Sequence, residues 1–168
     1  MEMFATYEQN ITWTYNMLRF KAPMPTYHEN MWLGIGYKTT TSDSADLVQC
    51  KWYQDNAYCT DHWNNRFPGT PEDDTQDDIY IYHADWQYNG YFDVGWKRKF
   101  NTTDGENDVV IPYDEDMSMI WAYGQVDSTT GEILIHEGYG VSMIHSPVVP
   151  GAAALTSIYL AVLAFICL

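Results

Sequence analysis

The chain has 168 residues, enough for one domain with a sizeable core and too few for two of ordinary size. Its 23 acidic residues against 8 basic ones give a formal charge of −15, which repels phosphate backbones, so we expect no nucleic-acid partner. Aromatic residues make up 16% of the sequence, and Trp and Tyr pack well on the half-buried surface of a sheet. The composition therefore favours a single β-rich domain.

Much of the acidity gathers in short turn-like stretches, residues 71–74 and 114–116. We interpret these stretches as solvated surface, with a calcium site as the alternative. No metal site is predicted.

Alternation of apolar and polar residues predicts the strands in chain order. The pattern begins at residues 11–17 and continues to Ala22, before Pro23 and Pro25 break it. A second apolar run at residues 31–37 contains two glycines, which indicate close backbone packing or a bulge. Further strands are predicted at residues 47–53, 57–63, 79–82, 91–100, 109–111, 117–123, 133–136 and 139–144. Short strands at this spacing predict an antiparallel sandwich or barrel.

The strands at residues 47–53 and 57–63 flank a polar turn at residues 54–56, which predicts a hairpin. Folding that hairpin brings Cys50 near Cys59. We predict a disulfide between them, which would contribute about 2–3 kcal/mol by closing a short loop; two buried thiols are the alternative. Cys167 is isolated in the apolar tail.

Two sequons, beginning at Asn10 and Asn101, fit glycosylation and the same oxidising, extracellular compartment as the disulfide. Residues 1–4 do not have the basic and then apolar pattern of a signal peptide. We therefore expect either that the sequence is incomplete upstream or that membrane entry depends on the tail.

The hydrophobic tail, residues 146–168, has no charged residue. Its last 18 residues, 151–168, would span about 27 Å as a helix, just enough for a bilayer core. We expect a transmembrane helix, with a removable glycolipid-anchor signal or a first span of a longer protein as alternatives. Either of the first two would make the membrane a partner and place residues 1–145 at the cell surface.

Several segments, in order, resemble the DOMON family, which includes a domain of dopamine beta-monooxygenase and the cytochrome domain of cellobiose dehydrogenase. The resemblance covers roughly residues 8–145. It implies an immunoglobulin-like β-sandwich outside the cell. The segments that carry it are residues 32–37, 45–48, Pro71 with 77–79, 92–104 with 108–109, 120–124, and His136 with Gly138 and Gly140.

In the haem-binding branch of that family, the resemblance implies a b-type haem held by a Met and a His. His136 matches the expected His position, whereas Ser42 stands where the Met is expected. Met31 or Met24 would have to substitute from another strand position. Haem b is thus an alternative cofactor, not the principal expectation, and His28, His62 and His83 are more simply interpreted as hydrogen-bonded structural residues.

A second hypothesis is a carbohydrate-binding platform, because aromatic rings offer apolar faces to sugars while polar groups bind hydroxyls. The competing interpretation is that the same rings form the core of the sandwich and its rim. The candidate platform residues are Trp52, Trp63, Tyr80, Tyr82 and Trp86.

The third hypothesis is a surface domain that uses one face for a protein partner. Known catalytic motifs for hydrolases, metalloproteases and nucleotide-binding enzymes are missing from the sequence, so no catalytic residues are predicted. We expect a membrane-tethered, non-catalytic extracellular module that binds a ligand or a protein.

Overall fold

The computed structural model describes residues 10–11, 15–23, 30–38, 43–66, 70–87, 91–104, 107–112 and 115–145. Within these residues the secondary structure is entirely β, with no helix, and therefore no helix long and apolar enough to cross a membrane. The predicted tail and the Ser42 position lie outside the described residues, as do Met24 and His28.

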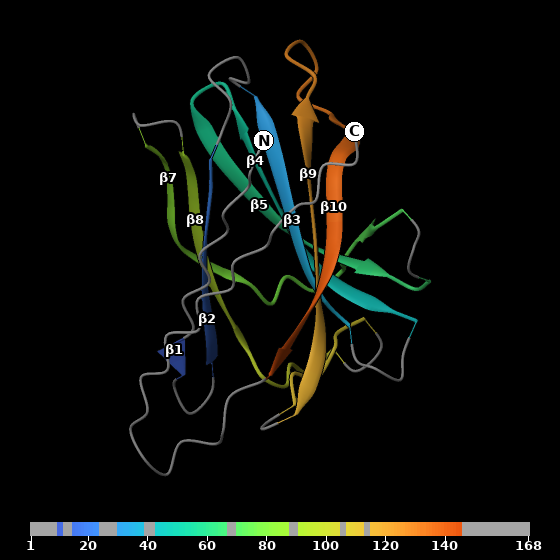
Figure 1. Ribbon diagram of the computed structural model, residues 1–168. Coiled ribbons are helices and arrows are strands. Elements are labelled where there is room, and N and C mark those ends of the chain that lie inside the picture. The colour runs from blue at the N-terminus through green and yellow to red at the C-terminus, as the bar shows by residue number, and fades with distance from the viewer. Residues whose placement is uncertain are drawn as a thin grey trace.

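In the described part of the chain, ten strands form two antiparallel sheets (Figure 1). The four-stranded sheet has the order β1-β2-β8-β7, and the six-stranded sheet has the order β10-β9-β3-β4-β5-β6. The strands are β1 (Asn10–Ile11), β2 (Tyr15–Pro23), β3 (Met31–Lys38), β4 (Ala45–Tyr53), β5 (Asn56–Asn64), β6 (Glu72–Asp73), β7 (Tyr80–Gln87), β8 (Tyr91–Lys99), β9 (Asp116–Val126) and β10 (Ile133–His145).

The core lies between the inner faces of the two sheets. Period-2 alternation sends Leu33 and Ile35 of β3 inward to meet Phe92, Val94 and Trp96 of β8, and all five are buried. The observed architecture is therefore a β-sandwich, as the sequence predicts.

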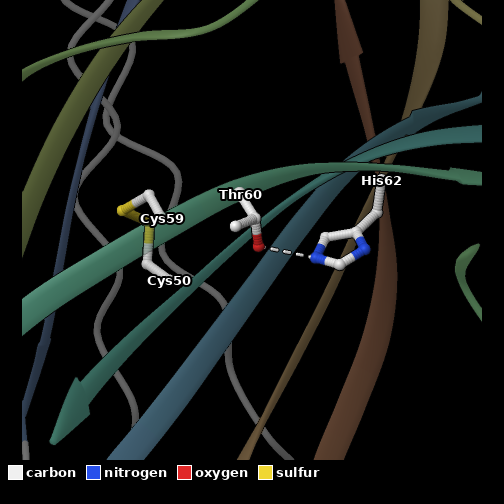
Figure 2. The surroundings of a disulfide bond; sticks show 4 residues. All are labelled: Cys50, Cys59, Thr60 and His62. Atoms are coloured by element: carbon white, nitrogen blue, oxygen red, sulfur yellow. Dashed lines mark hydrogen bonds between the residues drawn. A yellow bond between two sulfur atoms is a disulfide. The ribbon is translucent and has the colours of Figure 1, made fainter. Parts of the chain in front are cut away.

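The β4–β5 hairpin carries the predicted disulfide. Cys50 and Cys59 stand directly opposite each other with their Cα atoms 4.0 Å apart, and the bond between them is formed (Figure 2). Gln54 and Asp55 both have positive φ, 49° and 60°, so they make a two-residue turn of the kind that matches strand twist. The predicted turn was one residue too long, because Asn56 already pairs with Tyr53.

Two strand predictions need correction. Residues 109–111 are not a strand: they form a connection in which the Ile111 amide donates to the Phe100 carbonyl. The predicted strands 133–136 and 139–144 are one strand, β10, whose register against β9 shifts between His136 and Gly138. An extra residue at that bulge changes which face the neighbouring side chains occupy.

Candidate functional site

The two described candidates for haem ligation lie on opposite faces of the six-stranded sheet. Met31 is 4% exposed and belongs to the core between the sheets. His136 stands opposite Gly124, which stands opposite Trp32, so all three share the outer face. The exposed His136 ring there meets the Tyr139 ring edge-on, with centroids 4.7 Å apart.

The bulge in β10 decides this arrangement. Gly138 pairs with Tyr123, which packs against the core, so Gly138 is at an inward-facing position. Residues two apart on a regular strand share a face, so without the register shift His136 would also face inward. The register shift turns it outward instead. Met31 and His136 therefore cannot ligate one iron, since axial ligands must approach the same metal from its two sides.

His62 and His83 each lie near a carboxylate. His62 is buried on β5, where its Nε2 lies 2.7 Å from Thr60 Oγ1 (Figure 2). Its Nδ1 lies 3.2 Å from an Asp73 carboxylate oxygen. Burial lowers the pKa of His62. His83 Nε2 lies 3.5 Å from the buried Asp93 carboxylate. Over the described part of the chain, no three His, Cys, Asp or Glu side chains form a group that could hold a metal ion.

The five predicted platform residues do not form one surface. Trp63 is buried in the core, and Trp52 packs edge-on against Phe92 with ring centroids 6.2 Å apart. Trp86 stands opposite Phe92 in the register, a position on the inner face. The three tryptophan positions therefore belong to the interior of the sandwich. Of the five predicted platform residues, only the two tyrosines remain as candidates for a binding surface.

Tyr80 and Tyr82 are on the outer face of the four-stranded sheet. Tyr80 is 54% exposed, and the Lys97 ammonium lies 5.5 Å from the centre of its ring. Tyr82 is 44% exposed, and its ring lies against Gly95: a Cβ there would be 2.6 Å from Tyr82 Cζ. Gly95 therefore creates the space that lets the Tyr82 ring lie flat on the strand.

A group of charged side chains is buried between the sheets near one end. Arg98 of β8 is 1% exposed and donates through Nη1 to the Asp46 carboxylate of β4. Its Nη2 donates to the Val109 carbonyl at 3.1 Å and lies 3.5 Å from an Asp108 carboxylate oxygen. The Val109 amide in turn donates to Asp46 at 3.2 Å. We call Asp46, Arg98 and Asp108, together with Asp61, the interior charge cluster.

One guanidinium cannot neutralise three carboxylates, and Asp61 is the carboxylate left over. It is 6% exposed, and only one of its oxygens accepts a hydrogen bond, from the Asp78 amide at 3.0 Å. Burial, with Asp108 adding repulsion, raises the pKa of Asp61 to about 7. Burial also raises the pKa of Asp108, although Arg98 opposes the change.

A family model for the DOMON domain matches residues 6–124 of the chain. The chain belongs to the DOMON family. No curated protein sequence matches this DOMON domain significantly.

Two solved structures share the fold of this DOMON domain. The cytochrome domain of cellobiose dehydrogenase from Myriococcum thermophilum aligns with a TM-score of 0.60 at 12% identity, over 91% of this chain and 78% of that one. The cytochrome b domain of pyranose dehydrogenase from Coprinopsis cinerea aligns with a TM-score of 0.56 at 11% identity, over 78% and 67%. Identities this low establish a common fold and no common ligand.

The interior charge cluster draws three of its four residues from segments that carry the DOMON resemblance. Residues 45–48 supply Asp46, residues 92–104 supply Arg98, and the next connection supplies Asp108. Asp46 and Asp104 both accept backbone amides, from Val109 at 3.2 Å and from Asn107 at 3.1 Å. Arg98 was missed, although its place in the alternation of Phe92, Val94 and Trp96 marks it as inward-facing.

Proposed function

We propose that this DOMON domain is a non-catalytic carbohydrate-binding module that works outside the cytoplasm, tethered to a membrane by residues 146–168. The observation that carries the proposal is the pair of half-exposed rings, Tyr80 and Tyr82, beside Lys97 on one sheet face. A tyrosine offers an apolar ring to the hydrophobic face of a sugar and a hydroxyl to its polar edge. The sheet beneath holds both rings on a rigid support, which limits the entropy lost on binding.

The proposed location is supported by chemistry that needs an oxidising compartment. The Cys50–Cys59 disulfide would not persist in a reducing cytosol. Asn101 is exposed just beyond β8, so its sequon is accessible to glycosylation. Asn10 occupies the short strand β1. Fractionation of cells with and without phospholipase tests the tether: release would indicate a lipid anchor, and retention a spanning segment.

Electron transfer through a b-type haem is the second candidate, because the two solved structures described above are cytochrome domains. The opposite orientations of Met31 and His136 argue against it. Haem titration of the full chain should therefore give no Soret band that depends on His136. A band that is present in the wild type and disappears in His136→Ala would establish the cytochrome function instead.

A glycan-binding array probed with the full chain in nanodiscs tests the principal proposal. Tyr58 provides a matched control, because it is 46% exposed and has the Lys51 ammonium 5.8 Å from its ring, but belongs to the six-stranded sheet. We expect Tyr80→Ala to lose the glycans that the wild type binds, and Tyr58→Ala to keep them. Equal losses in both variants, or no bound glycan at all, would contradict the proposal.

A further inference from the structure

The six-stranded sheet ends in a long edge strand, β10. In the described part of the chain the two sheets have four edge strands: β1 and β6 have two residues each, β7 has eight with a register shift, and β10 has thirteen. Proteins usually protect an edge by keeping it short or by placing Lys, Pro or a bulge on it. β10 contains no Lys and no Pro, and its register shifts lie before Gly138. Its regular part, residues 138–145, therefore has none of these protections, and we call it the β10 edge (Figure 1).

The backbone groups of the β10 edge point away from the sheet at alternate residues. In an antiparallel ladder, each residue directs its N–H and C=O to one neighbouring strand, and the direction alternates along the chain. The Val126 amide donates to the Asn30 carbonyl next to β3, so the odd-numbered residues of β9 direct their groups to β10. The residues opposite them on the β10 edge are the even-numbered ones. Tyr139, Val141 and Met143 therefore direct three N–H donors and three C=O acceptors away from β9.

The same three residues present apolar side chains to solvent. Gly138 is at an inward-facing position, so alternation places Tyr139, Val141 and Met143 on the outer face of the sheet. Their side chains are 69%, 57% and 55% exposed. Gly138 and Gly140, at inward positions between them, carry no side chain. A strand added beside this edge would thus meet apolar side chains on the outer face and little obstruction on the inner face.

The surroundings of the β10 edge carry negative formal charge only. Residues 116–145, which form β9, β10 and the turn between them, contain four Asp and Glu residues and no Lys or Arg. Glu132, just before β10, is exposed. A second copy of the chain, itself at −15, would bring like charge to the same place. A basic partner is attracted instead, and this favours a different protein over self-association.

We propose that the β10 edge binds an extended, basic segment of a partner protein, which adds as a further strand of the six-stranded sheet. Backbone hydrogen bonds to Tyr139, Val141 and Met143 hold the segment, and apolar side chains at every second position pack against the three exposed side chains. Lys or Arg residues at either end of the segment are attracted by the acidic surroundings of the edge. The edge belongs to the six-stranded sheet, so this interaction is independent of carbohydrate binding on the other sheet.

A lipid surface is the other occupant that exposed apolar side chains suggest, but it fits the backbone less well. The hydrocarbon of a bilayer offers no acceptor to an N–H and no donor to a C=O, and unpaired groups there are costly. An added strand supplies both kinds of partner at the spacing of the ladder. The outward backbone groups of the β10 edge therefore point to a strand as the occupant.

The test uses the full chain in nanodiscs and a synthetic peptide with the sequence Lys-Lys-Val-Thr-Val-Thr-Val-Lys-Lys and both ends blocked. Residue-resolved amide hydrogen exchange is the readout. Without peptide, we expect fast exchange at Tyr139, Val141 and Met143, and slow exchange at Gly140 and Ser142, whose amides are directed to β9. Saturating peptide should slow exchange at the first three roughly tenfold or more and leave the other two unchanged.

Val141→Pro should weaken peptide binding by roughly tenfold or more, because it removes an outward N–H and leaves the bonds to β9 in place. Val141→Thr is the matched control. It keeps the donor and the branched shape, and should change the affinity by less than roughly threefold. Thermal unfolding shows whether each variant is folded. If Val141→Pro does not fold, the exchange rates of the wild type with and without peptide decide the test alone.

Charge is tested with a second peptide that has Glu in place of Lys. It should bind roughly tenfold more weakly or worse, and the difference between the two peptides should shrink as salt rises. Equal binding of both peptides would overturn the assignment of a basic partner.

Three further results would overturn the proposal. One is a peptide that leaves the three exchange rates unchanged, and another is equally tight binding to a folded Val141→Pro variant. The third is slow exchange at the three residues without peptide. Protection that depends on protein concentration would assign the edge to a second copy, and protection at every concentration would assign it to lipid or to another segment of this chain.

Discussion

Three consecutive cations, Lys97, Arg98 and Lys99, belong to two different regions of the molecule. Alternation along β8 sends Arg98 into the interior charge cluster and places Lys97 and Lys99 on the outer face. Arg98 is fully enclosed and makes two ion pairs, one with Asp46 that joins the two sheets and one with Asp108 in the connection after β8. Lys97 is partly exposed beside Tyr80.

The contrast teaches that burial, and not charge, decides what each of these cations does. Removing one partner of a buried pair leaves an uncompensated charge in a medium of low dielectric constant, which is costly. An exposed lysine is already hydrated, so its loss costs the fold little and matters mainly to a ligand. The interior of β8 should therefore govern stability, and its outer face should govern binding.

The largest expected effect is from Arg98→Met. The substitution preserves much of the apolar volume but leaves Asp46 and Asp108 without their cation, so we expect about 3–5 kcal/mol of lost unfolding free energy. Denaturant unfolding of the two variants Arg98→Met and Lys97→Met measures the contrast directly. We expect Lys97→Met to change stability by less than about 0.5 kcal/mol. Similar losses of unfolding free energy in the two variants would contradict the contrast between the buried arginine and the outer-face lysine.

Removing the disulfide should have the next largest effect, because Cys50 is also on the inner face. We expect Cys50→Ala/Cys59→Ala to lose about 2–3 kcal/mol, mainly because the unfolded chain is no longer constrained. The denaturation midpoint of oxidised wild type, reduced wild type and the double variant measures this. If the reductant also lowered the midpoint of the double variant, its effect could not be assigned to this bond.

The third prediction concerns the pH dependence of stability in the interior. Because burial raises the pKa of Asp61 from 3.8 to about 7, the folded state holds a proton that the unfolded state releases. This contribution to stability is complete below pH 3.8 and is lost as pH rises through about 7. One pKa unit corresponds to about 1.4 kcal/mol, so the loss is a few kcal/mol at most.

The variant Asp61→Asn should lose that part of the pH dependence of stability. The difference in unfolding free energy between variant and wild type should therefore favour the variant more at pH 8 than at pH 4. Asp127 supplies a control of opposite sign. It is partly exposed, and hydrogen bonds from the Thr130 and Thr129 amides lower its pKa, so its contribution to stability is lost as pH falls instead. An unchanged pH profile in Asp61→Asn would show that this carboxylate does not carry the proton.

The smallest expected effect on stability is from Gly95→Ala on the outer face. The added methyl group would displace the Tyr82 ring, which is partly exposed and can swing away, so we expect a change within about 1 kcal/mol. Carbohydrate binding should weaken because the ring no longer lies flat. In a Tyr82→Ala background the same substitution should have no effect on binding, and a double-mutant cycle measures that coupling.

The sequence predicted the parts of the fold that depend on near neighbours. Period-2 alternation identified most strands, and the hairpin placed Cys50 opposite Cys59, because both features arise within about ten residues of chain. Residues 109–111 were mistaken for a strand because all three are apolar and Val109 and Ile111 are buried. Their backbone amides instead donate to Asp46, 63 residues from Val109, and to Phe100.

The candidate site was harder to predict from the sequence, because its residues are defined by the face of the sheet on which they lie. Tyr80 and Tyr82 were identified by residue type together with Trp52 and Trp63, and only the packing of the two sheets separated exposed rings from core rings. The role of Arg98 was missed because its carboxylate partners come from β4 and a later connection.

The sequence by itself determined the DOMON family, the β-rich architecture and the disulfide, since each is encoded in local pattern and ordered motifs. The tertiary structure decided which side chains meet. A one-residue register shift in β10 turns His136 away from Met31, and the packing of the two sheets brings Arg98 of β8 to Asp46 of β4. Both outcomes depend on how strands pair and pack, and a shift of one residue in register inverts the face that each side chain occupies.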